Sequence, residues 1–276
     1  MLGCGGGGSF CCGDRLRVLL TNDDGFDAWG MRILREIAYE CFSEVWVSAP
    51  SCDRSSAGGA VSVSKKVAVH VVDKKECRVA GTPVDSVLMG VHRMIAGTGA
   101  KPDLVISGIN CGANVGRHVL SSGTIGAALA TSALGIPSIA VSQEYGCERN
   151  CVRCEDWKHS RKYLGGTLRQ LLNSPEKSWQ GKCIMSINIP HRERDVKGIA
   201  FSACGGTVSA SSFCIEELTD VENREGLTIQ YFMRGLTSGS SQAGDDASLL
   251  AQGYIVVTPL GCNITCYDTL NKFQLQ

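Results

Sequence analysis

A three-layer α/β fold around a mostly parallel sheet is the fold class that the sequence predicts. Three observations lead to it: short apolar runs typical of buried strands, helical patterns between them, and loops rich in glycine and hydroxyl groups directly after the strands. Continuous apolar strands are expected when helices cover both faces of a parallel sheet. We therefore expect a Rossmann-like core that binds its ligand outside the carboxyl ends of the strands.

The expected elements of the core alternate between strand and helix. The strands are short and largely apolar, and they cover residues 17–21, 45–49, 77–80, 103–107 and 137–142. The helices cover residues 29–42 and 125–134, with a third that begins at Pro83. Valines that alternate from residue 61 to 72 predict antiparallel strand or hairpin structure.

The second half of the chain is expected to extend this core. Its expected strands cover residues 183–189, 198–202 and 254–258, and its expected helices cover 163–172 and 247–252. Residues 227–232 are typical of one arm of a β-hairpin. We divide the chain into a disordered Gly/Cys-rich tail (1–13), a Rossmann-like core (14–142) and a C-terminal extension (143–276) whose hairpin serves oligomerisation, as a homodimer or homotetramer.

Charge and hydropathy exclude several classes of partner. Lysine plus arginine balance aspartate plus glutamate at 27 each, so no overall field attracts a nucleic acid duplex or an anionic membrane. No apolar run is long enough to form a membrane span, and the first residues lack the basic start and apolar middle of a secretory signal. We expect a soluble, cytoplasmic protein whose thiols are reduced.

An acidic pair directly after the first strand is the first candidate site. Asp23 and Asp24 can present several hard oxygens to a divalent cation at the edge where such folds bind ligands. The alternative is a capped turn between strand and helix. In that interpretation Asp24 or Asp27 is the helix N-cap, and Gly25 supplies backbone freedom.

Two further loops are expected at the same edge of the sheet. The strand over residues 103–107 opens into a glycine-studded polar loop that ends at a helix start, an arrangement typical of phosphate binding. Ser122 and Thr124 add hydroxyl donors there. The other loop covers residues 50–59, after the second strand, and is rich in hydroxyl groups and glycine. A separate motif, Thr82, Pro83 and Asp85, follows the strand over residues 77–80; for this motif, helix capping and a role in the site both remain open.

The chain contains 15 cysteines, a high and odd number. Many of them fall in or beside apolar runs, where a reduced thiol acts as a small hydrophobic group. Cys147, Cys151 and Cys154, with His159 beyond them, need separate consideration. Their spacing allows a zinc site or an iron–sulfur triplet. We favour incidental loop cysteines, because the stretch is polar and follows five βα-like segments.

Five motifs in this order resemble the SurE survival-protein family, densely from residue 17 to about 142. They are Val18-Leu-Leu-Thr-Asn-Asp-Asp-Gly25, Ala49-Pro50 with Arg54-Ser55, Gly81-Thr-Pro-x-Asp85, Ser107-Gly-Ile-Asn-x-Gly-x-Asn-x-Gly116 and Ser122-Gly-Thr124. The resemblance implies a metal-dependent 5′/3′-nucleotidase that hydrolyses phosphomonoesters; some members also cleave short polyphosphate.

The resemblance also implies roles for individual residues. The family's metal ligands fall on Asp23, Asp24, Ser55 and Asn110. Its phosphate contacts fall on Asn22, Asn114, Ser122, Gly123 and Thr124. Such an all-oxygen ligand set suits Mg²⁺ or Mn²⁺. The two aspartates are then the candidate catalytic residues, one of which could accept the proton of the attacking water.

We therefore expect an enzyme that hydrolyses nucleoside 5′-monophosphates, with 3′-monophosphates open. The sequence departs from the family's pattern at His118, where aspartate is common; this histidine is either a polar loop side chain or a group that contacts phosphate or donates a proton. Residues 201–206 lack the basic segment of many members, so base and polyphosphate recognition stay open.

The alternatives are a non-catalytic module that binds nucleotides or sugar phosphates, a broad-specificity acid phosphatase or exopolyphosphatase, and a phosphohydrolase of the haloacid dehalogenase type. The last is disfavoured because its Asp-x-Asp spacing is absent here.

Overall fold

The computed structural model describes residues 16–145, 154–175, 179–180, 182–205, 213–223, 226–235 and 242–274. The strands are β1 (Arg17–Thr21), β2 (Glu44–Pro50), β3 (Val69–Val71), β4 (Glu76–Val79), β5 (Leu104–Cys111), β6 (Ser138–Gln143), β7 (Cys183–Ile189), β8 (Gly198–Phe201), β9 (Phe213–Asn223), β10 (Gly226–Gly235) and β11 (Tyr254–Gly261). The α-helices are α1 (Trp29–Cys41), α2 (Pro83–Met89), α3 (Gly123–Ala133), α4 (Lys158–Asn173), α5 (Asp246–Ala251) and α6 (Tyr267–Gln274).

One nine-stranded sheet organises the body of the molecule, in the order β3-β4-β2-β1-β5-β6-β7-β11-β8. Its central strands are parallel, from β4 and β2 through β1 and β5 to β6 and β7. Antiparallel pairing occurs where β3 meets β4 and where β11 meets β7. The carboxyl ends of the central strands therefore share one edge, and the predicted α/β fold is confirmed.

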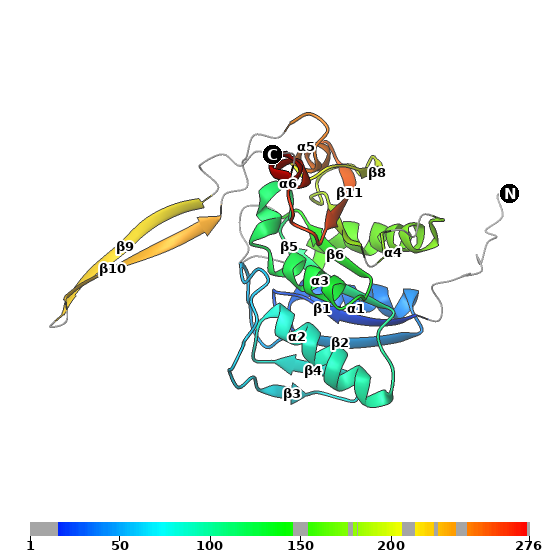
Figure 1. Cartoon of the computed structure of the whole chain (residues 1–276), viewed down its shortest axis with the longest axis horizontal. Helices are drawn as coiled ribbons and strands as arrows, with labels where there is room; N and C mark the ends of the chain where they lie inside the picture. Colours follow the sequence, from blue (N-terminus) through cyan, green and yellow to red (C-terminus); the bar gives the residue numbers. More distant parts are fainter. Residues whose placement is uncertain are drawn as a thin grey trace.

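Helices cover both faces of the sheet (Figure 1). Helices α1 and α4 pack together over one face, and α2 and α3 pack together over the other. Strand β1 shows why the run is continuously apolar: Val18 and Leu20 join the cluster under α1 and α4, while Leu19 joins the cluster under α2 and α3. All three side chains are fully buried, as a strand covered on both faces requires.

The valine-rich stretch over residues 61–72 departs from the prediction, because only Val69–Val71, near its end, form a strand, β3. Val61 and Val63 are exposed. The backbone next to these valines is bonded to other groups: Thr82 Oγ1 donates to the carbonyl of Ala60, and the N–H of Ser62 donates to the Asp85 carboxylate. These bonds hold the segment against the start of α2 instead of in a strand ladder.

Strands β9 and β10 form a separate antiparallel hairpin that projects away from the body in Figure 1. The main sheet itself continues across position 142, since β6 pairs with β7 in parallel. The tail expected over residues 1–13 lies outside the described residues. Within the described ranges, the helices are all too short or too polar to cross a membrane.

Candidate functional site

The acidic pair lies on a turn at the carboxyl end of β1 that two hydrogen bonds stabilise. The side chain of Asn22 closes this turn on itself: its Nδ2 donates to the Gly25 carbonyl at 2.8 Å, and its Oδ1 accepts from the Gly25 N–H at 3.2 Å. Gly25 has φ of 110°, a conformation that side-chain-bearing residues rarely adopt. Asn22 is fully buried, so in this structure its amide fixes the turn that carries Asp23 and Asp24.

The alternative interpretation, in which Asp24 or Asp27 caps the first helix, is wrong. The N-cap of α1 is Ala28, and no side chain caps the helix there. Asp24 instead accepts a 2.9 Å hydrogen bond from the Cys111 N–H at the end of β5, 87 positions away. Asp27 pairs with the guanidinium of Arg78. Asp24 therefore links the ends of two adjacent parallel strands.

Asp23 meets the start of α3. Its carboxylate is only 3% exposed, and Oδ1 accepts a 2.5 Å hydrogen bond from Thr124 Oγ1. A Cβ placed on Gly123 would lie 2.8 Å from the Asp23 Cβ, so glycine is required for this close approach. The carbonyl of Asp23 accepts from the Arg54 N–H at 2.7 Å, which brings the loop after β2 to the same place.

The loop after β2 connects these parts. Ser55 Oγ and the Ser55 N–H both bind Oδ1 of Asp53 at 2.7 Å. Gly58 N–H donates to the carbonyl of Ser121 at 3.2 Å, just before α3. This loop therefore bridges the acidic turn and the approach to α3, while the hydroxyl of Ser55 itself donates to Asp53.

Asn110 lies beside the Asp24 contact, at the end of β5. Its side chain is 5% exposed, and its Nδ2 donates to the Gly112 carbonyl at 2.8 Å. Because the nitrogen is used in this way, Oδ1 is the atom left for a ligand, and it makes no hydrogen bond within the described part of the chain.

The donor chemistry of the site fits a hard divalent cation. Among the residues that the structure describes, no three His, Cys, Asp or Glu side chains gather into a metal cluster. A cation here would have to be held by the two carboxylates with neutral amide and hydroxyl oxygens. Oxygen-only sites of this kind suit Mg²⁺ or Mn²⁺ and disfavour metals that prefer thiolate or imidazole.

The start of α3 is an open helix end next to Asp23. Ser122 is its N-cap, and its Oγ accepts from the Ile125 N–H at 3.1 Å. The N–H groups of Gly123 and Thr124, in the first turn, have no acceptor within their own helix. Together with the helix dipole, such groups attract an anion. Because the Thr124 hydroxyl donates to Asp23, its backbone N–H is the group suited to phosphate.

Asn114 is held from two neighbouring strands. Its N–H donates to Oδ1 of Asn188 at 2.8 Å, Asn188 Nδ2 donates back to its carbonyl at 3.0 Å, and its own Nδ2 donates to Ser142 Oγ at 2.8 Å. Sequence reasoning missed Ser142 and Asn188. The available signal was a polar residue near the carboxyl end of a predicted strand, Ser142 on β6 and Asn188 on β7.

The structure places the Thr82–Asp85 motif after β4, at the start of α2, and His118 in the loop after β5. Thr82 and Asp85 form a complete capping box on α2: the Asp85 N–H donates to Thr82 Oγ1 at 3.1 Å, and the Thr82 N–H donates to Asp85 Oδ2 at 2.8 Å. This accounts for the motif by helix capping. His118 lies in a 3₁₀ turn (η4, Gly116–Leu120) on the loop that leads to Ser122.

The cysteine triplet is only partly covered. Cys147 and Cys151 lie outside the described residues, and only the backbone of Cys154 is described. His159 is buried, with Nδ1 3.3 Å from the Pro190 carbonyl, and burial lowers its pKa.

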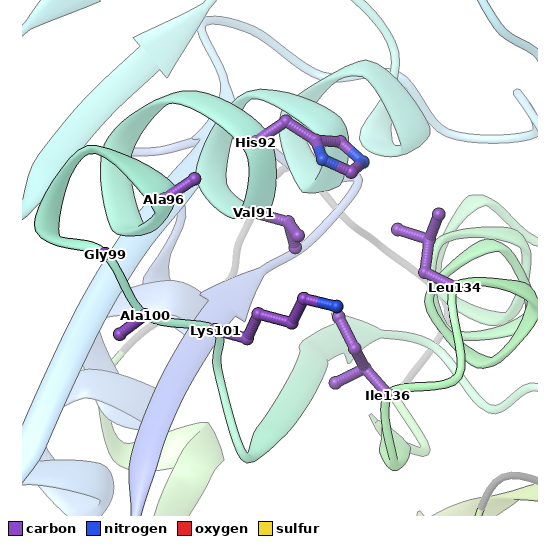
Figure 2. A pocket seen from close by; sticks show the side chains of 8 residues that line it. All are labelled: Val91, His92, Ala96, Gly99, Ala100, Lys101, Leu134 and Ile136. Atoms are coloured by element: carbon purple, nitrogen blue, oxygen red, sulfur yellow. The ribbon is translucent and has the colours of Figure 1, made fainter.

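Figure 2 shows the residues that line a surface pocket of about 350 Å³, two of which lie just before the amino ends of β5 and β6. Lys101 and Ile136, which precede β5 and β6, line it together with His92 and Leu134. It contains none of the predicted site residues and is separate from the acidic turn.

The fold and the site together define a class: an α/β protein in which an acidic turn meets the open start of a helix at the carboxyl edge of a parallel sheet. Comparison with known proteins identifies the group within that class. The family model for survival protein SurE matches residues 18–211, and the chain belongs to the SurE family.

Similar proteins cover almost the whole chain. The 5′-nucleotidase SurE of Anaplasma marginale (strain Florida) is 43% identical, over 94% of this chain and 98% of its own. That of Ehrlichia chaffeensis is 37% identical, over 94% of this chain and 97% of its own. The crystal structure of the SurE protein from Aquifex aeolicus superposes with a TM-score of 0.73 at 29% identity, over 94% of this chain and 98% of that one.

Proposed function

We propose that this chain is a divalent-metal-dependent phosphomonoesterase that hydrolyses nucleoside 5′-monophosphates to nucleoside and phosphate. The observation that carries the proposal is the hydrogen bond from Thr124 to Asp23, because it joins the candidate metal ligands to the candidate phosphate site. The similar proteins named 5′-nucleotidase SurE support the substrate class. Nucleoside 3′-monophosphates are proposed as secondary substrates, and a broad-specificity acid phosphatase or exopolyphosphatase is the alternative function.

The proposed metal ligands are Asp23, Asp24, Ser55 and Asn110. They come from the turn after β1, the loop after β2 and the end of β5, which hydrogen bonds connect. A bound Mg²⁺ or Mn²⁺ would supply Lewis acidity and offset the charge of a phosphate dianion. Two carboxylates give the ligand set two negative charges, so the loaded site would be near neutral and would not repel the substrate.

The other residues would position the phosphate and move the proton. The N–H groups of Gly123 and Thr124 donate to its equatorial oxygens, where charge develops in the transition state. Asn114 lies on the loop between β5 and α3, where Asn188 and Ser142 hold it in place. One of Asp23 or Asp24 accepts the proton of the attacking water.

We further propose that the enzyme acts in the cytoplasm as a homodimer or homotetramer. The β9–β10 hairpin projects from the body and offers its strands to a second copy (Figure 1). Size-exclusion chromatography with light scattering, on the full chain and on a variant that lacks residues 206–241, tests this role of the hairpin.

Phosphate release from a panel of nucleoside 5′- and 3′-monophosphates tests the function, with Mg²⁺, Mn²⁺ or EDTA present. We expect release with either metal, and loss of release in EDTA that excess metal restores. A non-catalytic nucleotide-binding module would release no phosphate under any condition. Release that persists unchanged in EDTA would overturn the proposed ligand set.

A further inference from the structure

Asp246 lies far from the acidic turn in sequence. It contacts the loop over residues 112–122, which joins β5 to α3 and which we call the candidate phosphate loop. Its Oδ2 accepts a 2.8 Å hydrogen bond from the N–H of Gly116, 130 positions away. Gly116 begins the η4 turn, which leads into Ser122 and the start of α3. The Asp246 side chain is 1% exposed, so this bond is shielded from water.

Asp246 also binds residues 203–205, which lie where the chain leaves the body toward the β9–β10 hairpin. Oδ1 of Asp246 accepts from the Gly205 N–H at 2.9 Å, and the Asp246 N–H donates to the Ala203 carbonyl at 3.2 Å. Residues 203–205 precede β9, and Asp246 follows β10. One side chain therefore joins the chain's departure to the hairpin, its return from the hairpin, and the phosphate loop.

Backbone donors compensate the buried charge of Asp246. Oδ1 also accepts from the Ala247 N–H at 2.9 Å, and no lysine or arginine pairs with this carboxylate in the described ranges. Cys204 reinforces the contact, since its Sγ donates to the Gly116 carbonyl at 3.1 Å. The N–H and the carbonyl of Gly116 are therefore both held by the C-terminal half.

We infer that Asp246 is a positioning residue for the reaction. It fixes the loop over residues 112–122, and this loop in turn positions the N–H groups in the first turn of α3 that would bind phosphate. The inference rests on the proposed function, but the hydrogen bonds that carry it do not involve the metal ligands. It assigns to the C-terminal half a part in positioning the loop that would bind substrate, in addition to any role in assembly.

Asp246→Asn is the decisive variant. Both oxygens of the Asp246 carboxylate accept hydrogen bonds from backbone N–H groups, whereas asparagine has one oxygen that can accept and one nitrogen that cannot. We expect KM for the nucleotide and the inhibition constant of inorganic phosphate to rise, with kcat/KM about tenfold to a hundredfold lower. The affinity for Mn²⁺ should stay unchanged. Hydrogen exchange should become faster in residues 112–122.

Asp245→Asn is the matched control. Asp245 is the N-cap of α5, through a 2.8 Å bond from the Ser248 N–H, and it makes no contact with Gly116. Cys204→Ala removes the weaker contact to Gly116 and tests the same loop if the Asp246→Asn protein does not fold. For Cys204→Ala we expect a rise in the inhibition constant of phosphate that is smaller than the rise for Asp246→Asn.

The outcomes separate the two proposals. A wild-type protein that releases no phosphate would refute the proposed function, whereas faster exchange and weaker phosphate binding in Asp246→Asn would still support the positioning role. An active wild type whose Asp246→Asn variant keeps its phosphate affinity and its exchange pattern would overturn the inference. A variant that only loses thermal stability, with the inhibition constant unchanged, would likewise reduce Asp246 to a structural residue.

Discussion

Thr124 Oγ1 donates a 2.5 Å hydrogen bond to Oδ1 of Asp23, across 101 positions of the chain. Both side chains are buried, Thr124 completely. The bond joins the carboxyl end of β1 to the first turn of α3, so the position of the acidic turn and that of the open helix end depend on each other.

Replacing Thr124 with valine should show what this bond contributes. Valine keeps the shape but cannot donate, and a hydrogen bond to a buried carboxylate is worth about 1.5–3 kcal/mol. We expect kcat/KM for a nucleoside 5′-monophosphate to fall about tenfold or more. Thr124→Ser, which keeps the hydroxyl, is the control and should stay close to wild type. A valine variant with the wild-type rate would show that the bond is dispensable.

Asp23→Asn should lower the turnover of p-nitrophenyl phosphate by about a hundredfold or more, because the amide lacks the negative charge with which Asp23 would hold the metal ion or accept the proton of the attacking water. The fold should survive, since the amide oxygen can still accept from Thr124. Steady-state kinetics and thermal unfolding together check this. Normal turnover in a folded Asp23→Asn protein would end the assignment of the acidic turn.

Asn188→Asp should weaken the support of Asn114. The carboxylate could still accept from the Asn114 N–H, but it would face the Asn114 carbonyl without a donor. We expect the free energy of unfolding to fall by about 1–3 kcal/mol and KM to rise. Urea unfolding and kinetics would measure both. If neither quantity changes, the reciprocal pair between Asn188 and Asn114 does not support the loop.

Asp85 should make stability depend on pH. Burial alone would raise its pKa, but hydrogen bonds from Ser62 and Thr82 outweigh burial and hold the pKa below its ordinary value of 3.8. The stabilising contribution is therefore present above pH 3.8 and is lost as the pH falls through the lower folded-state value.

We accordingly expect Asp85→Asn to lower the free energy of unfolding at pH 7 by about 1–2 kcal/mol. The difference from wild type should narrow as the pH falls below 3.8, which urea titrations at several pH values can follow. Asp73→Asn, at an exposed position, is a suitable control. A difference that does not vary with pH would contradict the role of the charge.

Cys204 should resist alkylation at neutral pH. Burial, and then the charge of Asp246, raise the pKa of its thiol to about 11, so the reactive thiolate is scarce at pH 8. Iodoacetamide at pH 8 should label the exposed Cys52 well before Cys204, as peptide mass mapping would show. Labelling of Cys204 should accelerate as the pH approaches 11. Equal labelling of the two cysteines at pH 8 would contradict this protection.

The sequence by itself determined the local elements of this protein. The apolar run before Asp23, the capping box of Thr82 and Asp85 and the N-cap at Ser122 depend on residues close together in the chain, and each was predictable from periodicity and turn chemistry. The family resemblance likewise rested on short motifs. These features were enough to predict the α/β class, which the sheet confirms, and to propose the carboxyl edge of the sheet for the candidate site.

Only the tertiary structure decided which polar groups meet. The bonds from Asn188 to Asn114 and from Gly116 to Asp246 span 74 and 130 positions, and no local pattern specifies such partners. The valines at 61 and 63 fail as strand residues for the same reason, since distant groups at Thr82 and Asp85 claim the neighbouring backbone. Side-chain periodicity records which face of an element is buried, whereas a buried hydrogen bond depends on where two distant elements come together in the folded chain.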